Sequence, residues 1–269
     1  MAQLEVADFI KPVFLTERAF SIANAAWPKI STYIEQQGGV RRYLTKLNAV
    51  NDPSFSDPTL KKFLFSYFIQ LLNPAGFFLK EFNLAYEIKN LNSYGATNSL
   101  LIVQSRGTAK IPFIIFDICV SNVLDISEDQ FEEVFFHELT HIEQATNLLL
   151  ELTVDNILET VPENRPLFID RLEQYFTDRN LDPKVNDGEI SSYARELALK
   201  IFTRHKIELK NMPLEDRKKF LSHNIIPYYE TYMSPGVKEN IFDNLSNASR
   251  GVFLRSFVSQ LYDFCDGLL

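Results

Sequence analysis

Residues 137–141 read His-Glu-Leu-Thr-His, so two histidines are separated by three residues and a glutamate directly follows the first. On an α-helix, residues four apart project from the same face, so His137 and His141 can place two imidazole nitrogens on one metal ion. Glu138 is turned by about 100° around the helix axis, where its carboxylate can accept a proton from water without ligating the metal. The pattern therefore predicts a zinc site with Glu138 as general base.

The same motif has a structural explanation, in which the histidines pack within a core and the glutamate pairs with a cation. A helical wheel favours function, because Glu138 falls on the inner side of an apolar stripe, where an unpaired carboxylate is costly. The stripe consists of Phe131, Phe135, Ile142 and Leu149. Other polar residues fall on faces that we expect to be exposed to solvent: Glu132, Glu133, Glu143 and Gln144.

A catalytic zinc needs a third protein ligand and an open position. Residues 186–198, NDGEISSYARELA, predict a second helix with Asp187 as its N-cap. Glu189, Tyr193 and Glu196 share one face of this helix, beside its apolar stripe. We expect Glu189 to be the third ligand and Glu196 to orient a histidine or pair at the surface. The helix dipole alone also favours a glutamate in the first turn, so this alternative stays open.

The two helices together resemble the gluzincins, zinc peptidases of the thermolysin-like type, over residues 84–205. The resemblance implies that His137, His141 and Glu189 bind Zn2+ and that Glu138 activates water. It also implies that a strand before the motif helix, at residues 110–121, aligns an extended peptide by backbone pairing. The run at 188–198 is similar to the glutamate segment of virus-encoded zincin-like proteins.

The chain departs from this family at one position, because Tyr193 stands where the family often has Asp or Ala. We take Tyr193 as the catalytic residue that stabilises the oxyanion, a role for which Tyr, His and Arg are the usual donors. Arg195, His205 and His223 stay open as candidates for the same role. No Gly-x-x-His follows His141, so the metzincin extension is absent.

The sequence patterns around these residues predict an α+β fold that is mostly helical, with a small antiparallel or mixed sheet. Residues 1–80 read as short helices broken by turns, with one break before Pro28, and residues 82–122 read as strands joined by hairpins. Pro112 is expected at a sheet edge or strand start. A long helix opens with Ser127 and Gln130 in capping-box spacing.

We expect a single zincin-like domain over residues 1–269. It would comprise a helical N-terminal extension (1–80), the sheet with the zinc-site helices (81–205) and a helical C-terminal part (206–269).

The formal charge of −8 argues against nucleic acid as a partner, because phosphate binding depends on Lys and Arg clusters. We find no signal peptide and no apolar run of about 18 residues, so we expect no membrane partner. Cys119 and Cys265 lie far apart, which fits a reducing, cytoplasmic compartment. The leading hypothesis is a metallopeptidase acting on a peptide or protein substrate. Two competing hypotheses are a non-catalytic zincin-like module stabilised by zinc, for example in a virus, and a hydrolase of a non-protein amide.

Overall fold

The computed structural model describes residues 21–49, 54–55, 57–87, 94–106, 109–121, 127–151, 187–213, 216 and 247–266, and within these ranges it does not describe some side chains, that of Glu189 among them. The chain divides into two compact units, Met1–Asn180 and Leu181–Leu269. The predicted fold class is confirmed, because the protein is α+β and mostly helical with a small mixed sheet. The expectation of one zincin-like domain stays a prediction.

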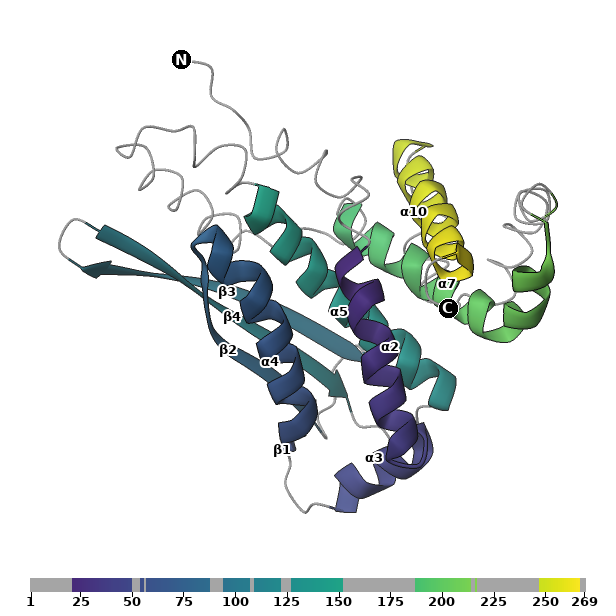
Figure 1. Ribbon diagram of the computed structural model, residues 1–269, viewed down its shortest axis with the longest axis horizontal. Coiled ribbons are helices and arrows are strands. Elements are labelled where there is room, and N and C mark those ends of the chain that lie inside the picture. The colour runs from purple at the N-terminus through teal and green to yellow at the C-terminus, as the bar shows by residue number, and fades with distance from the viewer. Residues whose placement is uncertain are drawn as a thin grey trace. The chain divides into compact units, whose positions relative to one another are not determined.

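Three of the described helices in the first unit come before the three long strands of the sheet, with a two-residue strand at Ser54–Phe55 between the second and third helices (Figure 1). Their bounds are Ser21–Gln36 for α2, Val40–Ala49 for α3 and Pro58–Leu72 for α4, followed by the 3-10 turn η2 at Asn73–Ala75. The predicted break before Pro28 is wrong, since α2 continues through this residue. Buried residues lie on both sides of the proline: Ile22, Ala26, Ile30 and Ile34. This continuous apolar stripe outweighs the hydrogen bond that a proline removes from a helix.

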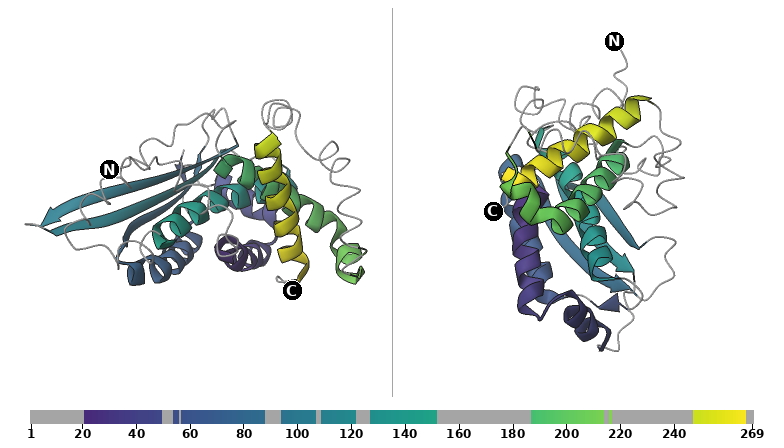
Figure 2. Two further views of the ribbon diagram at one scale, coloured as in Figure 1. Left: turned by 90° about the horizontal axis from the view of Figure 1, so that it is seen from above. Right: turned by 90° about the vertical axis from the view of Figure 1, so that its right-hand side faces the viewer.

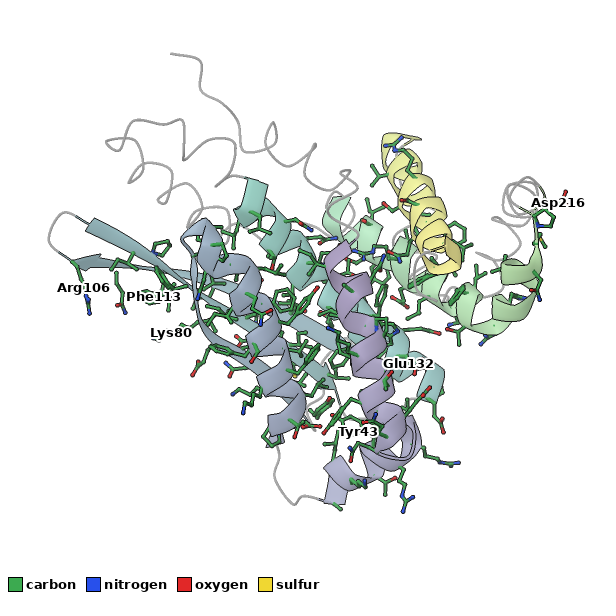
Figure 3. The ribbon with its side chains drawn as sticks, in the orientation of Figure 1. Tyr43, Lys80, Arg106, Phe113, Glu132 and Asp216 are labelled. Carbon is green, nitrogen blue, oxygen red and sulfur yellow. The ribbon has the colours of Figure 1, made fainter. Side chains whose placement is uncertain are left out.

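A buried polar network ties the helices to the sheet. Asp57 caps α4, since its carboxylate accepts hydrogen bonds from the backbone N–H groups of the first turn. The other carboxylate oxygen accepts hydrogen bonds from the hydroxyls of Tyr33 and Tyr43, each at 2.9 Å. Tyr43 (Figure 3) also lies 2.9 Å, hydroxyl to hydroxyl, from Tyr86 of the sheet. The network fixes α2, α3 and α4 relative to one another.

The sheet has the strand order β1-β2-β4-β3. The strands are β1 (Ser54–Phe55), β2 (Phe78–Glu87), β3 (Gly95–Arg106) and β4 (Ala109–Ser121). A hairpin joins β3 to β4 in antiparallel pairing, as predicted, whereas β2 and β4 are parallel. Pro112 lies near the start of β4. The pairing of β4 with β2 begins only at Phe113, so Pro112 does not have to donate a backbone N–H to β2. Among the described strands, β3 lies at this edge of the sheet.

One face of the sheet packs against helices. Its buried residues alternate along the strands, as expected for a sheet covered on one side: Phe82, Leu84, Ile114, Phe116, Ile118 and Val120. The left view of Figure 2 shows α4 and the later helix α5 (Glu128–Glu151) along this face. Gly95 and Thr97 pair with Val120 and Ile118, so they share the covered face. The edge strand therefore presents these two residues toward the helices.

The second unit contains α7 (Asp187–Asn211) and α10 (Asn247–Asp266), which pack on each other. Phe202 stacks on Phe264 with ring centroids 5.3 Å apart. The fully buried Arg195 donates a hydrogen bond from Nε to Gln260 at 2.6 Å. His205 has non-helical backbone angles, which mark a kink in α7. None of the helices within the described ranges is both long and apolar enough to cross a membrane.

Candidate metal centre

The His-Glu-x-x-His motif lies on α5. The predicted capping box is confirmed: Ser127 donates its backbone N–H to the Gln130 side chain at 3.0 Å, and Gln130 returns its own to Ser127 Oγ at 3.3 Å. The predicted apolar stripe is fully buried: Phe131, Phe135, Ile142 and Leu149. Trp27 of α2 packs on Phe135 and on the neighbouring Phe136, with centroid distances of 6.1 and 5.4 Å. The helix is therefore held from the sheet side and from the α2 side.

The two histidines of the motif converge on one point. Their Nε2 atoms lie 3.1 Å apart, and the rings stand at 74° to each other. Each side chain is only 6% exposed. The helical spacing thus brings together the two ring atoms that would bind a metal.

The separation of the two nitrogens fits a shared zinc ion. Zn–N bonds of about 2.0–2.1 Å at a tetrahedral angle place two nitrogen ligands about 3.3 Å apart. The observed 3.1 Å between Nε2 of His137 and Nε2 of His141 differs from this by about the spread of such bonds. Two neutral imidazoles are also suitable donors for zinc. The same distance suits a hydrogen bond between the two rings, so the pair fits both that hydrogen bond and half of a zinc site.

Gln144 orients the second histidine. Its Oε1 lies 3.1 Å from His141 Nδ1, in a position where only 5% of the glutamine is exposed. When Nδ1 donates its proton to this oxygen, Nε2 keeps the lone pair that a metal requires. The sequence predicts a solvent-exposed Gln144, which is wrong. The sequence predicts that Glu196 orients a histidine or pairs at the surface, which stays a prediction, whereas the observed partner of His141 lies one turn after it on the same helix.

Glu138 lies against the edge strand. Its side chain is 6% exposed, and Thr97 Oγ1 donates a hydrogen bond to its Oε2 at 2.6 Å. The structural explanation of the motif requires a cation beside this carboxylate. Within the described part of the chain, no Lys or Arg pairs with it. Its partner is instead a neutral hydroxyl from β3.

Two more glutamates of α5 are buried, contrary to what the sequence predicts. Glu133 is 5% exposed and Glu143 is fully buried, although both were expected to face solvent. The Glu143 carboxylate accepts a hydrogen bond from the backbone N–H of Ala23, in the first turn of α2. A carboxylate is favoured there because the first N–H groups of a helix lack partners within it. Burial, followed by the charge of Glu143, raises the pKa of Tyr67.

The strand expected to align a peptide is not available for that role. β4 pairs with β2 from Phe113 to Ser121 and with β3 from Ala109 to Val120. Its backbone groups are thus used on both sides, and a further strand has no place beside it. The edge strand next to α5 is β3, which sequence reasoning treated only as part of a hairpin.

The remaining predicted site residues lie on α7, in the second unit. Glu189 falls in its first turn, with a side chain outside the described set. Tyr193 and Glu196 are half-buried, while Arg195, a second candidate donor to the oxyanion, is buried and bound to Gln260. His205 is half-buried at the kink, and His223 lies outside the described residues.

No group of three or more His, Cys, Asp or Glu side chains suited to a metal occurs within the described residues. Because the Glu189 side chain is not among them, its role as third ligand stays a prediction. Comparison of the chain with protein-family models, curated proteins and solved structures finds no match. The function of the chain therefore has to be inferred from the geometry of α5 and β3.

Proposed function

We propose that the protein is a zinc-dependent hydrolase of peptide bonds, a gluzincin-like metallopeptidase that acts in the cytoplasm on a peptide or protein substrate. His137, His141 and Glu189 would hold the metal. One observation carries this proposal: two buried Nε2 atoms 3.1 Å apart, one of them on a ring whose other nitrogen is held by a glutamine. Two converging imidazole lone pairs are the arrangement that zinc binding requires.

The chemistry is divided between the metal and the chain. A bound zinc acts as a Lewis acid that polarises the scissile carbonyl and makes water more acidic. Glu138 accepts the proton of the attacking water and then donates it to the leaving amine. Two features favour this role. Glu138 directly follows the proposed ligand His137 in the sequence, and it is too buried to be an ordinary solvent-exposed surface charge. Tyr193 is proposed as the hydrogen-bond donor to the oxyanion.

The edge strand β3 is the proposed place for the substrate backbone. Within the described residues β3 pairs with β4, and we propose that an extended peptide adds to its other edge as a further strand. The same strand contacts Glu138 through Thr97. A peptide paired to β3 would therefore lie next to the residue that transfers the proton.

Two measurements on one pair of proteins test the proposal. Wild type and Glu138→Gln are purified without chelator, and zinc content and cleavage of fluorescein-labelled casein are measured for both. We expect about one zinc per chain in each protein and a loss of cleavage of at least about 100-fold in the variant. Absence of zinc from the wild type after zinc supplementation refutes the metal site. A variant that keeps wild-type cleavage, or that loses its zinc, refutes the role of Glu138.

A further inference from the structure

We propose that the edge strand β3 fixes the proton-transferring carboxylate of Glu138, with Thr97 as its positioning residue and Gly95 as the position that leaves space for it. This inference rests on the proposed function for the role of Glu138, but its structural part can be tested without a substrate. The two residues are alternate positions of β3, on the face that packs against α5.

Thr97 binds one side of the carboxylate. Its hydroxyl lies 2.6 Å from Glu138 Oε2 and 3.1 Å from the backbone oxygen of the same residue. A hydroxyl has one proton, and the shorter contact to a charged acceptor is the stronger hydrogen bond. No other described group donates to this carboxylate. The contact therefore fixes Oε2 against β3.

Gly95 lies against the other oxygen. A Cβ at this position would be 2.6 Å from Glu138 Oε1, 2.9 Å from Glu138 Cγ and 2.7 Å from Val134 Cγ1. All three distances are shorter than the 3.0 Å below which real Cβ contacts essentially do not occur, and only Glu138 Oε1 is the far end of a flexible side chain. Any side chain at 95 would therefore displace the carboxylate or separate β3 from α5.

A fixed carboxylate matters because glutamate has several rotatable bonds. Without a partner, the side chain would populate rotamers in which neither oxygen meets the water. A misplacement of about 1 Å can lower a rate by about 100-fold. Both contacts come from the strand that would bind the peptide, so peptide pairing and the position of the base depend on the same backbone.

The kinetic test compares three threonine variants, using a quenched fluorescent peptide selected from a random library by the wild-type zinc protein. Thr97→Val removes the hydroxyl but keeps the shape, and Thr97→Ser keeps the hydroxyl. Thr146→Val is the matched control, because it removes a buried hydroxyl of α5 that donates to Ile142 at 2.8 Å. We expect Thr97→Val to lower kcat about 10- to 100-fold with KM within about twofold. Thr97→Ser should recover most of the loss, and the control should keep wild-type kcat.

The position of the Glu138 carboxylate and the zinc affinity of the variants can both be measured without a substrate. Crystal structures of zinc-bound Thr97→Val and Gly95→Ala should show the Glu138 carboxylate moved from its wild-type position, with zinc affinity within about threefold of wild type because the ligands are untouched. An unmoved carboxylate in both variants overturns the inference, as does Thr97→Ser behaving like Thr97→Val. If the carboxylate moves but the wild type cleaves no peptide, the positioning role holds and the proposed hydrolase function fails.

Discussion

Replacing Gln144 with leucine should weaken zinc binding. Leucine has a similar volume and suits a site that is 5% exposed, but it cannot accept the proton of His141 Nδ1. In the metal-free protein, His141 can escape this loss by moving its proton to Nε2, where His137 Nε2 accepts it at 3.1 Å. In the zinc-bound protein this tautomer is excluded, because Nε2 binds the metal. The lost hydrogen bond therefore destabilises the zinc-bound protein more than the metal-free protein.

The size of the effect follows from one lost hydrogen bond between neutral groups. The 3.1 Å contact contributes about 0.5–1.5 kcal/mol net. In the variant the Nδ1 proton stays buried without the glutamine acceptor, so we expect a loss of binding free energy near the upper end of this range, about 1.4 kcal/mol. This corresponds to about a tenfold loss of zinc affinity. This lies at the lower limit of the 10- to 100-fold range typical of residues that orient metal ligands.

The assay is competition for zinc with a chromophoric chelator at fixed pH. Gln144→Glu serves as the control, because it keeps an acceptor at the same reach and should retain at least wild-type affinity. Far-ultraviolet circular dichroism checks that both variants are folded. Wild-type affinity in Gln144→Leu, or equal losses in the two variants, would refute the view that His141 is oriented by this side chain.

The remaining predictions concern the third ligand and the polar network. In the same competition assay, Glu189→Ala should weaken zinc binding far more than Glu196→Ala, and the reverse ranking in folded variants would reassign the ligand. Burial raises the pKa of Tyr43 and Tyr86 above the ordinary tyrosine value of about 10. Their contribution to stability is thus fully present below about pH 10 and declines as the pH rises further toward their raised pKa, so their tyrosinate absorbance should appear only with alkaline unfolding. Asp57→Ala should lower the free energy of unfolding in urea by about 2–3 kcal/mol, the sum of a lost N-cap and lost tyrosine hydrogen bonds; a loss below about 0.5 kcal/mol would contradict this.

Much of the fold around the site could be predicted because its signals are local. Alternating and β-branched runs at residues 82–122 predicted the strands of the hairpin, and Ser127 with Gln130 predicted the start of α5. The error at Pro28 shows the limit of this reasoning. A proline weakens a helix locally, but the packing that keeps α2 continuous comes from residues distant in sequence.

The contacts among the predicted site residues could be foreseen only within one helix. His137, Glu138 and His141 are defined by their spacing on α5, and the structure brings the two ring nitrogens together. The partners Thr97 and Gln144 could not be found in this way. The first comes from a strand 41 positions away. The second was assigned to solvent because a helical wheel shows where the apolar stripe lies but not what covers the other faces of the helix.

The burial of α5 limits what random mutagenesis can reveal about this protein. Every side chain from Phe135 to Asn147 is buried, including those with no part in the proposed chemistry. A mutational scan should therefore find this whole segment intolerant, since most substitutions there change volume or leave polar groups without partners. Loss of activity at a position would then report on folding as readily as on catalysis. Only near-isosteric changes, with abundance measured alongside activity, can separate the residues that act on substrate from those that hold the helix.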